Sequence, residues 1–370
     1  MKSKNMKQFR LGLTYDDVLL VPQRSSLRSR HDADTSTNIS KLIKLKIPII
    51  SANTDTVTES EMAIAMAKAG GIGIIHRFMT IKDQVDEVRT VKKEKVINPN
   101  LETIDGKGKL KVGGAVGVVD DCMERATALI KVGVDFILVD IAHGHAEHTI
   151  KAVEEIRSKF PQIEIMAGNV ATTQGVVDLI KAGANSIKVG IGPGSVCKTR
   201  LVTGCGVPQL TAILDCVEAA EHYNVPIIAD GGIKYSGDIT KALSAGASAV
   251  MLARLLQGTE ESASLPIIKD DRKYKISRGV ATIGAKLARS IASGKELNKN
   301  DIVDYVPEGV ESMVPYQGTT KEVLNQLVGG LRSGMSYCGA RTLEELKNNA
   351  EFIQVTPLSL IESAPRVGLG

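Results

Sequence analysis

Short apolar runs rich in β-branched residues recur along the chain, and most are followed by Gly, Ser or Asn and then by a helical pattern. These runs predict eight strands, at residues 47–52, 71–76, 112–118, 136–141, 163–168, 186–190, 227–229 and 249–252. The amphipathic segments between them predict helices, for example at 59–68, 123–132, 149–159, 175–182, 210–222 and 237–245. Because the strands are apolar almost throughout, both of their faces are expected to be buried. The pattern predicts an α/β fold, a (β/α)8 TIM barrel, with a doubly wound open sheet as the alternative.

The predicted barrel takes up residues 1–370 as one catalytic domain, with three segments outside the eight units. Residues 13–22 predict an opening strand, and residues 93–111 a short polar linker between the second and third units. A long insertion, residues 265–318, follows the last strand and contains a hairpin-like stretch at 268–276. A polar excursion of this length at the rim of a barrel is either a lid, here called a flap, or a surface loop.

Polar residues and glycines gather where the predicted strands end. They are Asn53, Asp55, Asp140, Asn169, the stretch 190–195 and Asp230-Gly231-Gly232. In a barrel all strand ends meet at the carboxyl-terminal mouth, where barrel enzymes hold their active sites. These residues are therefore expected to line one pocket, although tight turns alone would account for some of the glycines.

The stretch Gly190-Ile-Gly-Pro-Gly-Ser-Val-Cys197 carries the chemistry that stands out most. Its glycines let the backbone approach a ligand closely, and Cys197 follows on an expected rim loop rather than inside an apolar run. Asp230-Gly231-Gly232 and the turn 251–258 end the seventh and eighth strands, where barrels commonly bind phosphate. A cysteine beside a phosphate cradle indicates covalent attack on a phosphorylated substrate.

Charge and cysteine usage narrow the class of protein. The formal charge of +4 suits small anionic ligands. It does not favour nucleic-acid binding, because the sequence has no cluster of Lys and Arg interleaved with aromatic residues. No apolar stretch approaches the ~20 residues that span a bilayer, and no apolar segment typical of a signal peptide follows the basic N-terminus. Five cysteines without a paired spacing predict a reduced, cytoplasmic protein. The spacing of His143, His145 and His148 does not favour a zinc site.

Several stretches together resemble the IMP dehydrogenase/GMP reductase family. They are GIGPGSVCKTR at 190–200, ADGGI at 229–233, DTVTE at 55–59 and LVGGLRS at 327–333. The resemblance runs from Leu13 to about Ser363, and the motif around the cysteine is highly specific to the family. It implies that a cysteine attacks purine C2 and that a hydride moves between C2 and a nicotinamide cofactor. The expected ligands are therefore IMP, XMP or GMP together with NAD or NADP.

The resemblance also implies roles for particular residues. Cys197 would be the nucleophile, and Thr199 and Glu308 would form a proton relay. The implied substrate contacts are Ser195, Asp230, Gly231, Gly232, Arg254, Ser277 and Gly279, and the implied cofactor contacts are Asp140, Asn169 and Gly190. A K⁺ site would use the carbonyl groups of Gly192, Gly194 and Cys197, completed by Glu362 and Ser363 of a neighbouring subunit. That arrangement implies a homotetramer.

The direction of the reaction is less clearly marked. The stretches 315–318 and 336–340 are more similar to bacterial IMP dehydrogenases, and residues 93–111 stand where many of them insert CBS domains. An Arg-Tyr pair that serves as the base of the dehydrogenase is absent between residues 278 and 308, where Arg289 or Lys295 are the candidate replacements. The positions that depart from the family pattern are Thr54, Lys198, Arg254 and Ser277. IMP dehydrogenase is the leading interpretation, with GMP reductase and a nucleotide-binding protein without turnover as alternatives.

Overall fold

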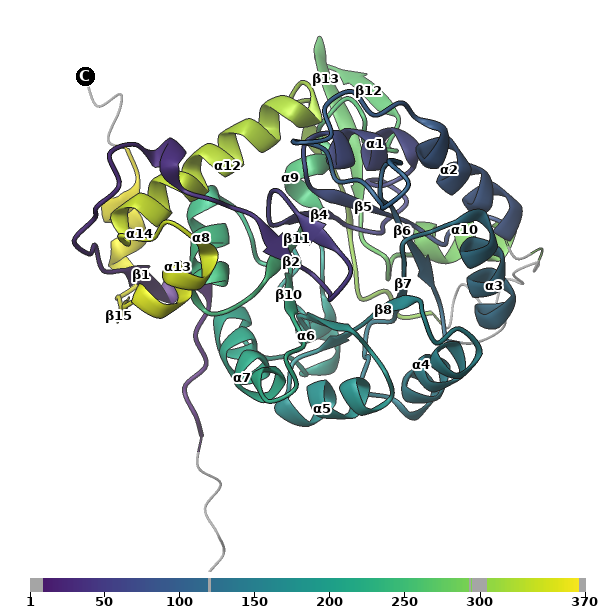
Figure 1. Ribbon diagram of the computed structural model, residues 1–370, viewed down its shortest axis with the longest axis horizontal. Helices are drawn as coiled ribbons and strands as arrows, with labels where there is room; N and C mark the ends of the chain where they lie inside the picture. The colour runs from purple at the N-terminus through teal and green to yellow at the C-terminus, as the bar shows by residue number, and fades with distance from the viewer. Residues whose placement is uncertain (1–8, 119–120, 293, 295–304, 366–370) are drawn as a thin grey trace, which may run out of the picture.

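The computed structural model describes residues 9–118, 121–292, 294 and 305–365, and it contains a closed barrel of parallel strands (Figure 1). In chain order the barrel strands are β4 (Ile49–Ser51), β5 (Ile72–Ile75), β6 (Gly113–Val116), β7 (Phe136–Asp140), β8 (Glu164–Val170), β9 (Ser186–Val189), β10 (Ile227–Asp230) and β11 (Ala249–Leu252). The barrel closes because β11 pairs with β4. The predicted (β/α)8 architecture is therefore confirmed, and the open-sheet alternative is excluded.

Helices surround the barrel on its outside (Figure 1). They are α1 (Ser60–Lys68), α2 (Ile81–Lys93), α3 (Cys122–Val132), α4 (Glu147–Lys159), α5 (Thr173–Lys181), α7 (Gln209–Glu221), α8 (Ser236–Ser244) and α12 (Thr320–Tyr337). Helix α2 was not among the predicted helices, yet it begins at an ordinary N-cap, since the Thr80 hydroxyl accepts a hydrogen bond from the Asp83 amide at 3.1 Å. Two basic residues, Lys92 and Lys93, lie in its last turn, where they complement the helix dipole.

The hydrophobic core has two parts, one between strands and helices and one inside the barrel. At the amino-terminal end of the barrel, a small hairpin of β2 (Thr37–Asn38) and β3 (Lys44–Leu45) contributes to the inner core, which also contains Phe136. The ring of Phe136 fills the space beside Gly113, where an added Cβ would lie 2.4 Å from the ring. The barrel is therefore filled with side chains at this end, and ligand space is left at the opposite end.

The segment 93–111 is more than the predicted polar linker. Glu102 and Thr103 are buried, Leu110 is fully buried, and an isolated bridge joins Ile104 to Leu110. The Glu102 carboxylate accepts hydrogen bonds from the backbone amides of residues 97 and 98. The linker prediction is corrected in this respect: the segment is a loop packed on the barrel, and its polar side chains fold it onto itself.

The insertion after β11 is built from an antiparallel sheet and a helix. The sheet contains β12 (Pro266–Lys269), β13 (Arg272–Arg278) and β14 (Glu311–Pro315), and helix α10 (Ile283–Ala292) lies between β13 and β14 in the chain. The hairpin predicted at 268–276 is confirmed, whereas β14 and α10 had no counterpart in the prediction. The β12–β13 hairpin projects from the barrel in Figure 1.

Segments from near the two ends of the chain, within residues 9–365, lie together in an extension on one side of the barrel (Figure 1). Strand β1 (Val18–Leu20) lies inside the predicted opening strand and pairs with β15 (Phe352–Gln354). Helices α13 (Leu343–Asn349) and α14 (Leu358–Ser363) flank β15 in the chain. Among the described residues, no helix combines the length and apolar character needed to cross a membrane.

Candidate active site

A cavity of about 560 Å³ opens where the barrel strands end. Its walls come from the ends of six strands (β4 and β7 to β11) and, in the insertion, from residues 278–281 and 308–309. The predicted site residues in these walls are Asp140, Asn169, Gly190, Gly192, Gly194, Ser195, Cys197, Thr199, Asp230, Gly231, Gly232, Arg254, Gly279 and Glu308. Residues that are far apart in the sequence therefore share one pocket, and their roles there remain predictions.

The cysteine loop is held between the barrel and the insertion. Gly190 begins it with a φ of +153°, and an added Cβ there would lie 2.0 Å from the backbone oxygen of Asp230, so only glycine fits. On the other side, the Lys198 amide donates to the Glu308 carbonyl at 2.6 Å, and the Val310 amide donates to the Val196 carbonyl at 2.9 Å. This short antiparallel pairing fixes the cysteine loop against the insertion.

Cys197, Thr199 and Glu308 form one hydrogen-bonded line. The Cys197 thiol donates to the Thr199 hydroxyl at 3.2 Å, and that hydroxyl donates to the Glu308 carboxylate at 2.7 Å. Thr199 begins helix α6 (Thr199–Thr203), whereas Glu308 comes from the insertion. A hydroxyl between a thiol and a carboxylate can pass a proton from one to the other without a change of backbone position.

A largely buried network of charges lies in the wall of the cavity. The Lys188 ammonium is 2.9 Å from Asp140 and 2.7 Å from Asp230, and the amides of Asn53 and Asn169 donate to the same two carboxylates at 2.9 Å each. Burial alone would raise the pKa of Asp140, but Lys188 and Asn53 hold it below its ordinary value. Burial alone would lower the pKa of Lys188, but the two carboxylates raise it above its ordinary value. Asp140 and Lys188 are therefore both charged at neutral pH.

Lys188 was missed by the sequence reasoning. It lies in β9 between Ile187 and Val189, and its side chain is almost fully buried. A lysine inside an otherwise apolar strand is itself a signal, because a buried ammonium group requires a carboxylate partner. That signal would have placed a charged network at the end of the strand that precedes the cysteine loop.

The predicted substrate contacts line the cavity, with one exception. Ser195, Gly231, Gly232, Arg254 and Gly279 all line it. Arg254 begins the short helix α9 (Arg254–Gln257), and no described residue accepts a hydrogen bond from its exposed guanidinium group. Arg254, an implied substrate contact, therefore presents a guanidinium group that a ligand could bind.

Ser277 is the exception. It is fully buried and is absent from the cavity wall, and its hydroxyl donates to the Gln257 side chain at 2.5 Å. The prediction that Ser277 contacts phosphate is corrected for a physical reason: the serine side chain is too short to reach past Gln257, which does line the cavity. Ser277 therefore supports the wall from behind.

The three predicted cofactor residues occupy the wall in different ways. Asp140 is held by Lys188 and Asn53, as described above, at the end of β7. The Asn169 amide donates to the Gly190 carbonyl and to Asp230, both at 2.9 Å, so its donors position the cysteine loop and a neighbouring carboxylate. Gly190 supplies backbone to the wall. The group therefore shapes the pocket through the backbone as much as through side chains.

The predicted cation site lies only partly within one chain. Gly192, Gly194 and Cys197 share the cysteine loop, and the Gly194 carbonyl accepts a hydrogen bond from the Cys197 amide at 3.1 Å. Glu362 and Ser363 are in α14 and do not line this cavity, and their role in a neighbouring subunit stays a prediction. Lys295, one candidate for the missing base, lies outside the described residues.

A closed parallel barrel whose mouth holds a thiol, a hydroxyl and a carboxylate in line has the construction of a barrel enzyme. The chain belongs to the IMP dehydrogenase/GMP reductase family, since the model described as the IMP dehydrogenase / GMP reductase domain matches residues 12–366. Members of this family are oxidoreductases that use nicotinamide cofactors.

Some relatives named as IMP dehydrogenases and others named as GMP reductases are similar to this chain over nearly its whole length. The inosine-5'-monophosphate dehydrogenase of Borreliella burgdorferi is 43% identical over 390 residues, covering 96% of each chain. The GMP reductase of Leishmania donovani is 36% identical, covering 95% of this chain and 96% of its own. A variant of the Trypanosoma brucei GMP reductase, solved in complex with guanosine 5'-monophosphate, superposes with a TM-score of 0.91 at 34% identity, covering 98% of this chain and 99% of its own. The family and the fold are thus clear, and the two activities are both represented.

Proposed function

We propose that this chain is a purine-nucleotide oxidoreductase that acts at purine C2 through a covalent bond to Cys197. The observation that carries this proposal is the line from the Cys197 thiol through Thr199 to the Glu308 carboxylate at the cavity wall. A thiol must lose its proton before it attacks, and this line provides a nearby acceptor. The loss of any one of the three groups would leave the nucleotide-binding alternative, whereas all three are present.

The remaining walls fit a nucleotide monophosphate. Glycine backbone at 231 and 232, the Ser195 hydroxyl and the Arg254 guanidinium can receive the phosphate, because exposed N–H groups and cations favour a dianion. Asp230 uses one carboxylate oxygen for Lys188 and Asn169, which leaves the other to accept hydrogen bonds from ribose hydroxyls. The base would then extend along the cysteine loop, so that C2 comes to the sulfur of Cys197.

The dehydrogenase reaction can be written with every atom placed. Sulfur of Cys197 bonds to C2 of IMP and the thiol proton is lost, and departure of hydride from C2 leaves a thioimidate. Water then adds to C2, the C2–S bond breaks with return of a proton to sulfur, and XMP is released. A nicotinamide cofactor, when bound, supplies the acceptor of the hydride. The Thr199–Glu308 pair takes up and returns protons at C2 and at sulfur.

The family implies two bound groups, a nicotinamide cofactor and K⁺, and residues in the cavity wall could hold each of them. Asp140, Asn169 and the Gly190 backbone line the same cavity as Cys197, so they could hold a nicotinamide ring, which would supply the acceptor of the hydride. For K⁺, backbone carbonyl oxygens are suitable hard ligands, and those of Gly192 and Cys197 accept no hydrogen bond from any described residue. The cation would hold the loop in shape, with Glu362 and Ser363 of a neighbouring subunit in a homotetramer.

Of the two directions, we propose IMP dehydrogenase first and GMP reductase as the second candidate. The reductase would expel ammonia from C2 and accept hydride there. The absence of the Arg-Tyr pair favours the reductase. Arg289, the candidate replacement base that the structure describes, also favours it, because Arg289 contacts the Phe78 ring. That ring follows β5, which lies across the barrel from the strand that carries the cysteine loop. The whole chain would act as one catalytic domain in a reducing, cytoplasmic compartment, in keeping with five unpaired cysteines.

The test is the absorbance of the reduced nicotinamide. IMP with NAD should increase it if the chain is a dehydrogenase, and GMP with NADPH should decrease it if the chain is a reductase. If neither pair changes the absorbance while nucleotide still binds in a separate titration, the enzyme proposal fails for these substrates and a binding protein remains.

A further inference from the structure

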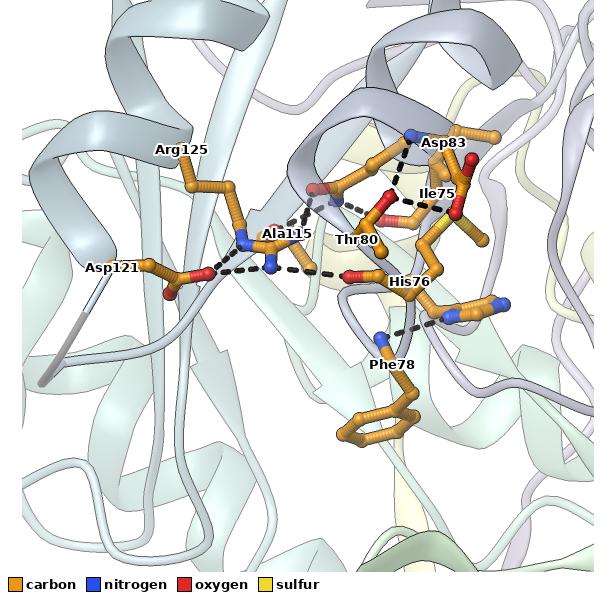
Figure 2. A network of polar contacts seen from close by, with 10 residues as sticks. Ile75, His76, Phe78, Thr80, Asp83, Ala115, Asp121 and Arg125 are labelled. Carbon is orange, nitrogen blue, oxygen red and sulfur yellow. Dashed lines mark hydrogen bonds and ion pairs between the residues drawn. The ribbon is translucent and has the colours of Figure 1, made fainter. Parts of the chain in front are cut away.

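One buried cation of the insertion differs from the other buried cations of the described chain. Three of the four buried lysine and arginine side chains form an ion pair with a carboxylate, namely Lys92, Arg125 and Lys188. Figure 2 shows one of these pairs, in which Arg125 donates to Asp121 at 2.8 Å. The fourth is Lys275 in β13, which is 4% exposed and forms no ion pair with any described carboxylate. A buried ammonium group without an acid requires other oxygen atoms as partners.

Three uncharged oxygens surround the ammonium group of Lys275. It donates to the carbonyls of Glu260 and Ser262, at 2.8 Å each, and to the Ser262 hydroxyl at 3.0 Å. These three acceptors match the three N–H donors of an ammonium group. Burial lowers the pKa of Lys275, although the nearby charge of Glu260 acts in the opposite direction. The lysine therefore occupies a group of carbonyl and hydroxyl oxygens that resembles a binding site for a monovalent cation.

The oxygens belong to the loop that follows helix α9, so Lys275 holds the end of that helix. The Ser262 hydroxyl, which accepts from Lys275, donates to the Gln257 carbonyl at 2.8 Å. Ser277 lies two positions after Lys275 and therefore on the same face of β13. As described above, its hydroxyl donates to the side chain of the same glutamine. Strand β13 thus fixes Gln257, the last residue of α9, through both its backbone and its side chain.

The turn 254–258 lies between the ligand space and the sheet of the insertion. Arg254, Leu255 and Gln257 line the cavity. Gly258 is packed against the end of β14, where an added Cβ would collide with the Pro315 carbonyl. The Gly258 carbonyl also accepts a hydrogen bond from the Gln317 amide at 2.8 Å. The position of the turn therefore depends on the insertion as well as on the barrel.

We propose that Lys275 is a positioning residue: its ammonium group takes the place of a bound monovalent cation and holds the turn 254–258 where it receives the nucleotide phosphate. The inference rests on the proposed function only for the identity of the ligand. Lys275 acts through Ser262 and Gln257 and does not line the cavity itself. Loss of its charge would leave three oxygens without their donor, so the loop and the turn would shift together. Because the base and the ribose are bound elsewhere in the cavity, only the phosphate contribution to affinity should change.

The test compares GMP with guanosine, which lacks only the phosphate, in calorimetric titrations of the full chain. Lys275→Met keeps the length of the side chain and removes the ammonium group. The control Lys269→Met removes an exposed charge from the neighbouring strand β12. We expect Lys275→Met to weaken GMP binding by about tenfold or more, while guanosine binding and the control stay within about twofold. Ser262→Ala leaves the lysine its two carbonyls but removes the link to Gln257, and it should weaken GMP binding by about threefold with little change in melting temperature.

A second measurement replaces the ammonium group from solution. Lys275→Ala leaves room for the missing part of the side chain, so propylammonium should restore GMP binding toward the wild-type affinity. The control compound is 1-propanol, which has a similar size and no charge and should not restore binding. Neither compound should change GMP binding by wild type or by Lys269→Ala.

The outcomes separate this inference from the proposed function. If Lys275→Met weakens guanosine binding as much as GMP binding, or if propylammonium and 1-propanol act alike on Lys275→Ala, the positioning role is wrong even when turnover is observed. If GMP binding depends on Lys275 and Ser262 as expected but neither substrate pair is turned over, the positioning role stands and the proposed function fails. If wild type binds neither GMP nor IMP, both are wrong.

Discussion

The barrel and the insertion both build the mouth, but they do so in different ways. At the strand ends of the barrel, Lys188 is 3% exposed and each of its two carboxylate partners also accepts a hydrogen bond from an asparagine. In the insertion, Glu308 and Arg289 are partly exposed, and the segment that carries Glu308 is joined to the cysteine loop by a single short backbone pairing. One region is buried and its charged groups are paired with one another, and the other is more open and holds an excess of cations.

The difference indicates a division of tasks. The strand-end network is complete without a ligand, so it can fix the shape of the pocket in advance. The insertion supplies the carboxylate of the proposed proton relay and cations that a ligand could neutralise. Substitutions at the strand ends should therefore be seen first in stability, and substitutions in the insertion first in kinetics. Each prediction below can break or refine that distinction.

The largest effect is expected at Cys197, where the two regions meet. Cys197→Ala should lower turnover by at least about 10³-fold, because the covalent path is lost, while nucleotide binding and melting temperature stay close to wild type. Steady-state kinetics and a nucleotide titration measure the two parts. Cys205→Ala is the matched control, since Cys205 is an exposed thiol eight positions further along. Substantial turnover in Cys197→Ala would remove this residue from the mechanism.

Glu308→Gln should have the next largest effect, about a 10²-fold loss of turnover, because the amide keeps the size of the side chain but cannot take up a proton. The melting temperature should change little if the insertion acts mainly in kinetics. Asp271→Asn makes the same chemical change in the hairpin turn, at a left-handed position that asparagine tolerates. A large stability loss in Glu308→Gln with modest kinetic change would reverse the assignment of tasks.

Lys188→Met tests the barrel side. The variant leaves Asp140 and Asp230 without their shared cation, which should cost about 3–5 kcal/mol of the free energy of unfolding. Denaturant unfolding measures this loss, and Lys181→Met on the exposed side of α5 is the control. If Lys188→Met unfolds like wild type while turnover alone falls, the network serves chemistry rather than the shape of the pocket.

The loss in Lys188→Met should depend on pH in a defined direction. In wild type the folded pKa of Asp140 is lowered, so its stabilisation is present at neutral pH and disappears as the pH falls through that pKa. Without Lys188, burial should raise the folded pKa of Asp140, and its contribution should then be lost as the pH rises. The difference between the two proteins should therefore be larger at about pH 8 than at about pH 5.

The same division explains how much could be predicted from the sequence. The strands and the pocket followed from periodicity, because parallel barrel strands are apolar throughout and end in polar residues at one face. Within the insertion, the sequence pattern predicted only the hairpin. Strand β14 and helix α10 were not predicted, because they depend on packing against segments that are distant in the sequence. Ser277 was predicted as a substrate contact for a related reason. The resemblance indicates which position corresponds to a substrate contact in the family, but whether the side chain reaches the cavity depends on its size, and the short serine stays behind Gln257.

The smallest effect is expected at Arg254, which tests whether free cations at the mouth act on the ligand. Arg254→Ser should raise the nucleotide KM by about tenfold at low salt and by less as ionic strength increases, because an exposed charge pair is screened. Arg272→Ser is the control for the lost charge. If Arg254→Ser instead tightens binding, the guanidinium obstructs the phosphate position. The unpaired cations of the mouth would then select among ligands rather than attract them, whereas the charged groups at the strand ends are paired with one another.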